Sequence, residues 1–353
     1  METIIKWSLG IDVGSKSLRC CLSSISTIQA VKVKASRKFN NSPGALQDLL
    51  VWIEKHYKGQ QAPLSIAMEA TGVYYERWAL LLQEKGYRVS VILPTKAKRY
   101  FQALGLKSKN DKIDAEGLAR MGAEQQLAEW SAASCEMYGL RLLTRQHEDL
   151  QKSITSFNNQ LHAVSNGMYR FEDIERTYQE TLLRLQELLK HVAVAIRETI
   201  EANEELKQKV ELLCSIKGVG ELTAATIIAE TNGFALFDNY KQLESYSGYD
   251  VIENQSGDHV GSTKISKKGN THIRRILHMA ALNVVTYNVK PFVDLYERVY
   301  PKTNIKMKGY VAVQRKLLVM LYTLYKKNER FDPEYQQKTI REKELEPSFG
   351  SAS

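Results

Sequence analysis

The sequence predicts an α/β domain with a mixed sheet, followed by an α-helical remainder. Residues 4–39 contain three apolar-rich segments typical of strands, and residues 42–104 then alternate between helical and strand-like patterns. Residues 138–210, in contrast, contain little glycine, no proline and an apolar stripe at helical spacing. Antiparallel strands followed by parallel strand–helix units form a mixed sheet covered by helices.

Each element of the first third follows from its residue pattern. We expect strands at 4–13, 18–24 and 28–39, the last partly exposed because its apolar residues alternate with basic ones. Ser42 and Pro43 provide an N-cap and a first-turn proline for a helix that extends to Lys55. The remaining elements are a strand at 64–68, a helix at 75–85, a strand at 88–93 and a helix at 95–104. This order of elements is that of an RNase H-like domain.

The middle of the chain is predicted to form long helices. Its apolar stripe consists of Leu182, Leu185, Leu189, Val192 and Ile196. Such a stripe is compatible with a helical bundle inside a domain and with a coiled-coil arm for dimerisation. Either structure separates two functional halves of the chain.

Length and composition indicate a folded protein of two or three domains. The chain has 353 residues, of which 43% are hydrophobic and 25% charged. No apolar run approaches the ~20 residues of a membrane span, and the first residues lack a signal-peptide pattern, so we expect a cytoplasmic protein without a membrane partner. The four cysteines lack metal-binding spacing, which argues against zinc and disulfides and predicts reduced, mostly buried thiols.

The net charge of +9 favours a polyanionic partner. A single basic run is compatible with a solvated face, but three runs beside candidate catalytic residues favour contact with nucleic acid. The runs comprise Lys96, Lys98, Arg99, Lys107 and Lys109; then Lys264, Lys267, Lys268, Arg274 and Arg275; and then the residues from Lys302 to Lys316.

A glycine-containing turn is a further candidate for phosphate binding. Gly218 and Gly220 precede an alanine-rich helix at 221–230, in a pattern that resembles a helix-hairpin-helix element. Such an element presents backbone N–H groups to a DNA phosphate. A plain turn between two helices would also require a glycine, so both interpretations stay open.

Four acidic residues form the strongest candidate for a catalytic site. Asp12 ends the first strand, and Glu69 follows the strand at 64–68, where a buried carboxylate needs a cation or a donor. Asp111 and Asp114 lie three residues apart near a helix start and therefore share a face. Taken alone, each acid is compatible with an N-cap or a surface charge, and Asp111 with a cap of its own helix. Together they suit two divalent ions, Mg²⁺ or Mn²⁺, about 3.5–4 Å apart, which assist phosphoryl displacement.

The segments around these acids resemble the three acidic motifs of DEDD transposases of insertion sequences, relatives of the Piv-type DNA invertases with a RuvC-like N-terminal domain. The motifs are Gly10–Gly14, Met68–Gly72 and Asn110–Ala115, and the likeness continues through Ile216–Gly220, Gln255–Gly257, Ile265–Asn270 and Arg274-Arg275. It therefore covers most of the chain in the family's order. It implies a RuvC-like catalytic domain at 1–137, a helical or coiled-coil dimerisation segment at 138–210, a C-terminal transposase domain at 211–330 and a polar tail at 331–353.

The resemblance also implies a nucleophilic serine in the C-terminal domain, which Ser256 matches. A free serine is a weak nucleophile and needs a base, a metal or positive charge, which Lys264, Lys267 and Arg274 could supply. Without the resemblance, the sequence around Ser256 favours a turn residue. Ser262 and Ser266, in the same polar segment, are the alternatives. A phosphoserine–DNA bond would conserve the phosphodiester energy, in agreement with the absence of an ATP-binding P-loop motif.

The implied partners are donor and target DNA, a structured guide RNA encoded by the element (a bridge RNA) and further copies of the chain in a dimer or tetramer. Two other functions fit part of the pattern. A Holliday-junction or structure-specific endonuclease would use the same acids with water as nucleophile, and Ser256 would be dispensable. A nucleic-acid-binding scaffold would use only the basic surface and would show no metal-dependent cleavage.

Overall fold

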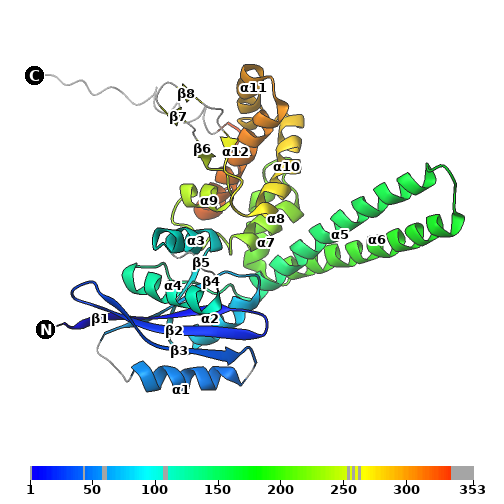
Figure 1. The fold of residues 1–353 in the computed structure, drawn as a ribbon. Helices are drawn as coiled ribbons and strands as arrows, with labels where there is room; N and C mark the ends of the chain where they lie inside the picture. The colour runs from blue at the N-terminus through cyan, green and yellow to red at the C-terminus, as the bar shows by residue number, and fades with distance from the viewer. Residues whose placement is uncertain are drawn as a thin grey trace, which may run out of the picture. The chain divides into compact units, whose positions relative to one another are not determined.

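The computed structural model describes residues 2–42, 44–57, 62–105, 110–252, 255–256, 259–260 and 264–334. The chain divides into two compact units, Met1–Ala132 and Ala133–Ser353 (Figure 1). Each unit has its own hydrophobic core.

The first unit is built on a five-stranded mixed sheet. Its strands are β1 (Ile4–Val13), β2 (Ser17–Ser26), β3 (Val31–Asn40), β4 (Leu64–Glu69) and β5 (Arg88–Ile92), in the order β3-β2-β1-β4-β5. The pairs β1–β2 and β2–β3 are antiparallel, whereas β1–β4 and β4–β5 are parallel. This topology is RNase H-like and confirms the fold class predicted from the sequence.

Helices cover both faces of this sheet. They are α1 (Ala45–Tyr57), α2 (Tyr74–Glu84), α3 (Pro94–Ala103) and α4 (Asp111–Glu124). On one face, Leu9 and Ile11 of β1 share a core with α1 and α2. On the other face, Ala67 of β4 packs with α3 and α4, and Cys21 of β2 packs with α4. Successive residues of a strand point to opposite faces of the sheet. The position of a residue in this alternation therefore decides whether it packs against α1 and α2 or against α3 and α4.

The start of β3 differs from the prediction by three residues, whereas that of β2 differs by one. β3 begins at Val31 rather than at Ile28, because residues 27–30 form a turn. Within it, Gln29 has a left-handed φ of 60°, and the N–H of Ser26 donates to the carbonyl of Ala30 over 3.1 Å. α1 begins at Ala45, and the proline predicted for its first turn lies outside the described residues.

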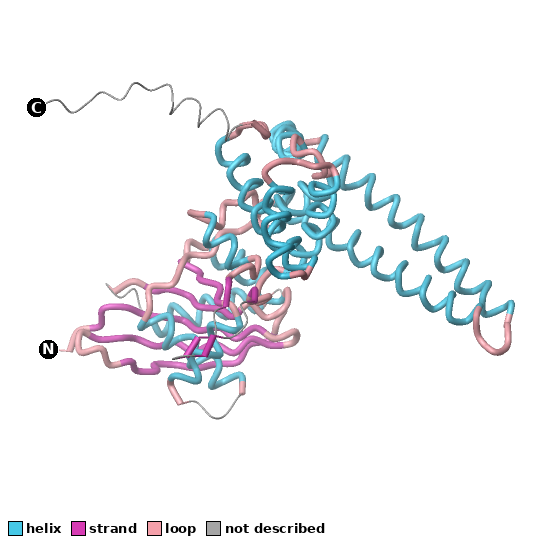
Figure 2. The backbone as a smooth tube through the Cα atoms, turned by 90° about the horizontal axis from the view of Figure 1, so that it is seen from above, coloured by secondary structure: helices cyan, strands magenta, loops and turns pink. Residues whose placement is uncertain are grey.

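The second unit contains a long antiparallel helical hairpin, formed by α5 (Cys135–Ser165) and α6 (Glu172–Glu201). The predicted apolar stripe is the packing face of α6, where Leu182, Val192 and Ile196 are buried. The base of the hairpin joins the core of this unit, and its further part extends away from that core (Figure 2). The two long helices therefore pair with each other within one chain.

The rest of the second unit is mostly helical, as predicted. Residues 223–230 of α8 are all buried, and α8 packs against α5, α7 and α10. The elements after the hairpin are α7 (Glu204–Cys214), α8 (Glu221–Glu230), α9 (Tyr240–Tyr246), β6 (Val251–Ile252), β7 (Gln255–Ser256), β8 (His259–Val260), β9 (Lys264–Ile265), α10 (Thr271–Thr286), α11 (Phe292–Thr303) and α12 (Lys306–Lys327).

The cysteines are free thiols: Cys20 and Cys21 are buried, Cys214 is half-buried and Cys135 is exposed. Within the part of the chain that the structure describes, no helix combines the length and the apolar character needed to cross a bilayer.

Candidate functional site

Two of the predicted acids lie side by side at the carboxyl ends of adjacent parallel strands. Ile11 of β1 pairs with Met68 of β4, so Asp12 and Glu69 occupy the next positions of the two strands. Both acids point to the face covered by α4, because Gly10 and Ala67, two residues earlier in each strand, contact that helix. Both residues are half-buried.

The position of α4 on this face is set by small residues. A Cβ on Gly10 would lie 2.2 Å from the carbonyl oxygen of Ala115 and 2.3 Å from the amide nitrogen of Ala119, so the helix backbone contacts β1 directly. A Cβ on Gly122 would lie 2.3 Å from Oγ of Ser8. Because later residues of the helix contact earlier residues of the strand, α4 runs antiparallel to β1. Its N-terminus therefore lies toward the strand end that carries Asp12.

The first turn of α4 contributes the other two acids. Asp111 lies one turn before Ala115, which packs over β1, and Asp114 lies one turn before Leu118, which packs with Ala67 of β4. The two acids thus continue the helix stripes that cover β1 and β4. Four carboxylates from three elements are in this way directed to one end of one sheet face.

The helix cap excludes one of the alternative interpretations. Asn110, not Asp111, is the N-cap of α4, and its Oδ1 accepts a hydrogen bond of 2.9 Å from the N–H of Ile113. Asp111 is consequently a first-turn residue, and capping does not explain it. The partial positive charge at the helix N-terminus interacts favourably with acidic side chains in the first turn.

The donor chemistry of this end of the sheet fits a hard divalent cation, which prefers carboxylate oxygens. Cys21 beneath α4 is not a candidate ligand, because burial raises its pKa to about 11 and keeps the thiol protonated. Among the described residues, no three acidic, histidine or cysteine side chains lie close enough together to hold one ion. The backbone thus directs the acids to one place, but their side chains do not form a closed coordination sphere.

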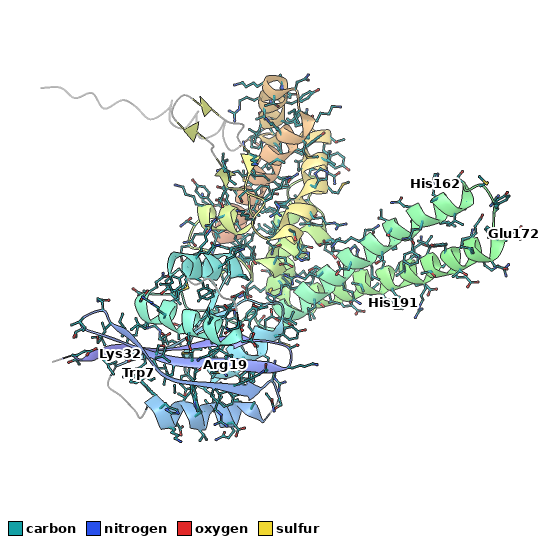
Figure 3. All side chains as sticks on the ribbon, in the orientation of Figure 1. Trp7, Arg19, Lys32, His162, Glu172 and His191 are labelled. Atoms are coloured by element: carbon teal, nitrogen blue, oxygen red, sulfur yellow. The ribbon has the colours of Figure 1, made fainter. Side chains whose placement is uncertain are left out.

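A basic residue beside Asp12 escaped the prediction from sequence. Arg19 of β2, labelled in Figure 3, lies opposite Asp12 in the antiparallel ladder. Residues paired in this way have their side chains on the same face of the sheet. Its Nε is buried and has no hydrogen-bond acceptor among the residues that the structure describes. A guanidinium in such a position can bind a phosphate oxygen. The available signal was weak: Arg19 is the single charged residue in the sequence of β2.

Three of the five basic residues predicted to contact nucleic acid in this unit lie on α3 (Pro94–Ala103). Lys96, Lys98 and Arg99 are exposed there, while Ala97 between them is buried against α4. No carboxylate lies within ion-pair distance of these three side chains in the described part of the chain. Lys107 and Lys109, predicted for the same surface, lie outside the described residues.

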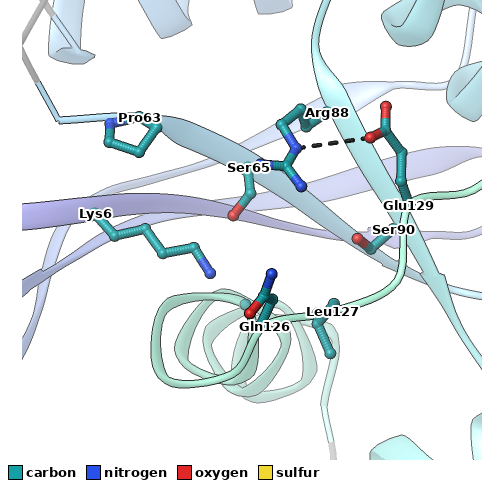
Figure 4. A pocket seen from close by; sticks show the side chains of 9 residues that line it. Lys6, Pro63, Ser65, Arg88, Ser90, Gln126, Leu127 and Glu129 are labelled. Carbon is teal, nitrogen blue, oxygen red and sulfur yellow. Dashed lines mark ion pairs between the residues drawn. The ribbon is translucent and has the colours of Figure 1, made fainter.

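A cavity of about 310 Å³ lies at the opposite, amino ends of β1, β4 and β5 (Figure 4). Lys6 lines it and donates from Nζ to the carbonyl oxygen of Gln125 over 2.9 Å, and burial lowers the pKa of this lysine. Arg88 and Glu129 form an exposed ion pair of 3.7 Å at its edge. Because the four acids belong to the carboxyl ends of the strands, this cavity is not part of the acidic site.

In the second unit, Ser256 belongs to a short strand pair. β7 carries it and pairs with β8, with Ser256 opposite His259. In the sequence, this pair lies between the two strands of a second antiparallel pair, β6 and β9. In that pair, Val251 is opposite Ile265 and Ile252 is opposite Lys264. We call residues 246–252 and 264–270 the stem, because they hold the two ends of the segment that contains Ser256. Of the alternative serines, Ser266 lies in the stem and Ser262 lies outside the described residues.

The basic residues beside this segment divide into two kinds. Lys264, Lys267 and Lys268 are exposed. Arg274, in contrast, is half-buried and donates from Nη1 to the carbonyl oxygen of Ser247 over 2.8 Å, which ties α10 to the stem. Arg275 lies 3.3 Å from Glu148 of α5. Both arginines therefore also make contacts within the protein.

The predicted glycine turn lies between α7 and α8. Gly218 has a left-handed φ of 106°, and a Cβ there would lie 3.0 Å from the backbone nitrogen of Val284, so the packing against α10 requires this glycine. Gly220 is exposed and is the N-cap of α8, and a Cβ there would meet no atom within 4 Å. The tertiary structure thus accounts for Gly218, whereas phosphate binding at Gly220 stays a prediction.

Two models of known families match this chain. A model of the DEDD transposases of the IS110 type, described as "Transposase", matches residues 9–169, which include all four acids. A second model, described as "Transposase IS116/IS110/IS902 family", matches residues 210–297, which include Ser256. The chain belongs to the IS110 family of DEDD transposases.

Curated relatives of this IS110-family transposase match it over most of their length. The pilin gene-inverting protein of Moraxella bovis is 26% identical over 329 residues, which are 93% of this chain and 98% of that one. The transposase for insertion sequence element IS1111A of Coxiella burnetii is 24% identical over 293 residues, 75% of this chain and 79% of that one. The solved structure of Thermus thermophilus RuvC is 16% identical, with a TM-score of 0.28, and the match covers 35% of this chain and 99% of RuvC.

The residues predicted for the active site of this IS110-family transposase are divided between its two units. The four acids belong to the first unit, and Ser256 belongs to the second. Each unit can therefore be tested separately by substitution.

Proposed function

We propose that this IS110-family transposase cuts and rejoins DNA with Ser256 as nucleophile and with Asp12, Glu69, Asp111 and Asp114 as a metal-binding acidic site. One observation supports the acidic site above all others. Two strand ends and the first turn of α4 direct four carboxylates to the same end of one sheet face. The proposal for Ser256 depends on its place in the family's motif order.

The proposed serine step exchanges one phosphodiester for another. The hydroxyl oxygen of Ser256 bonds to the phosphorus, the bond to one sugar oxygen breaks, and the proton of the serine ends on the released sugar hydroxyl. Rejoining reverses the step, when a sugar hydroxyl of another strand attacks the phosphoserine and releases the serine. The number of phosphodiester bonds is conserved, so the reaction needs no ATP.

The acids and Arg19 would act on the phosphate rather than on the serine. Asp12, Glu69, Asp111 and Asp114 would hold Mg²⁺ or Mn²⁺, which supplies positive charge to the phosphate oxygens when bound. Arg19, beside Asp12, would donate hydrogen bonds to a non-bridging oxygen and so fix the orientation of the phosphate. Holding the phosphate in one geometry relative to its attacker contributes to the rate of the reaction.

The exposed basic residues are proposed to bind nucleic acid. Lys96, Lys98 and Arg99 form one such surface on α3, and Lys264, Lys267 and Lys268 form another beside the Ser256 segment. Lys107, Lys109, Gly218, Gly220, Arg274 and Arg275 complete the proposed set.

We propose that specificity comes from an element-encoded guide RNA that pairs with donor and target DNA, and that two or four copies of the chain act together. The domain roles proposed are catalysis for residues 1–137, dimerisation for 138–210 and the serine step for 211–330. The name of the Moraxella relatives, pilin gene-inverting protein, agrees with a reaction that rejoins DNA as well as cutting it.

The test of this proposal is to trap the covalent intermediate on a suicide DNA substrate, with the element's RNA and Mg²⁺ present. We expect the parental protein to form a protein–DNA adduct, and Ser256→Ala to lose the adduct while its DNA affinity is unchanged. An adduct that persists in Ser256→Ala but disappears in Ser262→Ala or Ser266→Ala identifies a different nucleophile. Cleavage without any adduct contradicts the serine mechanism and favours an endonuclease that uses water.

The acidic site is tested by the same assay with isosteric amides. Asp12→Asn, Glu69→Gln, Asp111→Asn and Asp114→Asn should each reduce cleavage by at least about 100-fold, because loss of one acid alters a shared metal site. Asp48→Asn, an exposed acid in the first turn of α1, is the matched control and should cleave at the parental rate. An amide variant with parental activity removes its residue from the site.

A further inference from the structure

A buried carboxylate in the second unit lies outside every site described above. Glu230, the last residue of α8, has a fully buried side chain and accepts two hydrogen bonds from Arg145 of α5, at 2.6 and 2.9 Å. Burial raises the pKa of Glu230, but the hydrogen bonds from Arg145 and Asn270 together outweigh this effect and lower it. Glu230 is therefore an ionised acceptor in the protein interior.

The third donor to Glu230 is Asn270, which begins α10. Nδ2 of Asn270 lies 2.7 Å from Oε2 of Glu230, while Oδ1 accepts from the N–H groups of His272 and Ile273 at 2.9 and 3.1 Å. The carboxylate accepts only, so it selects the orientation of the amide in which the NH₂ group faces α8 and the oxygen caps α10. Glu230 thus determines how the cap of α10 is placed.

Asn270 is also the last residue of the stem. Its N–H donates to the carbonyl oxygen of Tyr246 over 2.7 Å, and the preceding Gly269 has no room for a Cβ, which would lie 2.4 Å from that same oxygen. Further along the stem, the N–H of Lys267 donates to Gly248 over 3.0 Å. The contact between Glu230 and Asn270 therefore fixes the strand that returns from the Ser256 segment.

A second acid, Glu148 of α5, contacts the N-terminal end of α10. Glu148, one turn after Arg145, accepts from His272 Nδ1 at 2.7 Å and from Arg275 at 3.3 Å. Two successive turns of α5 thus support the region where the stem ends and α10 begins: Glu148 contacts α10 directly, and Arg145 acts through Glu230. Neighbouring pairs of this kind make the placement of Asn270 resistant to small movements.

We infer that Glu230 is a positioning residue, which holds the segment carrying Ser256 in place through its hydrogen bond to Asn270. This inference rests on the proposed role of Ser256. Glu230 itself touches neither DNA nor the reacting atoms, and it acts by fixing one end of the stem. Its loss should slow the serine step without weakening DNA binding.

The test compares two single variants with their combination. Asn270→Asp keeps the oxygen that caps α10 but places a second carboxylate against Glu230. Glu230→Gln keeps the shape of the side chain but weakens the pair with Arg145. In the double variant, the amide of Gln at 230 can donate to Asp at 270, which restores the hydrogen bond with its polarity reversed. Glu175→Gln is the matched control, because Arg170 and Glu175 form a similar two-bond pair at the tip of the hairpin.

We expect adduct formation per folded protein to fall at least 10-fold in each single variant and to recover to within about threefold in the double variant. DNA affinity should stay unchanged, and hydrogen exchange of the stem amides should rise in the single variants only. Glu175→Gln should form the adduct at the parental rate. Adduct formation at the parental rate in both single variants would overturn the inference alone. Absence of a Ser256-dependent adduct in the parental protein would overturn the proposed function, and the inference with it.

Discussion

The carbonyl oxygen of Ala115 in α4 lies only 2.2 Å from the position that a Cβ on Gly10 of β1 would occupy, which is too close for any side chain at residue 10. Helix and strand are therefore in direct backbone contact, and this contact determines how close the first turn of α4 lies to the end of β1. The acidic site depends on it, since Asp12 follows Gly10 by two residues and Asp111 precedes Ala115 by one turn.

Gly10→Ala should destabilise the first unit, because backbone atoms cannot move aside as a flexible side chain can. We expect the free energy of unfolding to fall by about 3 kcal/mol or more, the upper end of the usual cost of overpacking. Thermal and denaturant unfolding of the purified protein would measure it. Gly44→Ala is the control, since a Cβ at Gly44 meets no atom within 4 Å. Equal stability of the two variants would contradict the packing described for α4.

Arg19→Met should reduce DNA cleavage by about 100-fold, the usual effect of removing one donor that stabilises charge in the transition state. The fold should persist, because methionine retains the aliphatic part of the side chain and removes a buried Nε without an acceptor. Cleavage kinetics and a melting curve would check both statements. Arg37→Met is a suitable control, because Arg37 lies over the ring of Phe39 on the opposite face of the sheet. Parental cleavage by Arg19→Met would exclude Arg19 from phosphate binding.

DNA affinity should fall steeply with added salt, because each phosphate neutralised by a lysine or arginine releases counterions. The logarithm of the association constant should decrease linearly with the logarithm of the salt concentration. Replacing Lys96, Lys98 and Arg99 together by alanine should reduce the magnitude of that slope by about 2 to 3, because each phosphate that the protein neutralises contributes about 0.9. Fluorescence anisotropy with labelled duplex DNA at several salt concentrations would measure both slopes. An unchanged slope would show that the exposed face of α3 does not bind the DNA.

The second unit should lose stability in mild acid. Hydrogen bonds from charged and polar donors lower the pKa of Glu148 and Glu230 below the ordinary value of 4.5, in spite of burial. A carboxyl group with a lowered pKa in the folded state stabilises the protein above its unfolded pKa, and that stabilisation is lost as the pH falls from 4.5 through the lowered pKa. Denaturant unfolding between about pH 6 and pH 3 should therefore show a falling free energy of unfolding. Glu230→Gln should show a shallower fall, and an identical pH dependence would contradict the ionised state of Glu230.

The sequence by itself determined the strand and helix order of the first unit and the position of the acids within it. Alternating apolar residues define strands locally, and an acid that ends an apolar strand, as Asp12 does, stands out without any knowledge of the fold. The three acidic motifs and their order were likewise sufficient to indicate the family, which the matches to known families confirm. The roles of the individual site residues stay predictions.

Only the tertiary structure decided which residues surround those acids and the Ser256 segment. Strand pairing places Arg19 opposite Asp12. Gly10 contacts Ala115, which is 105 residues later in the sequence. Glu230 is bonded to Arg145, which is 85 residues earlier. Local periodicity carries no information on such pairs, because a contact between distant segments depends on which faces pack together and in which register. The same reason applies to Asn270: only the fold shows that this residue caps α10 and that a buried carboxylate fixes the orientation of its amide.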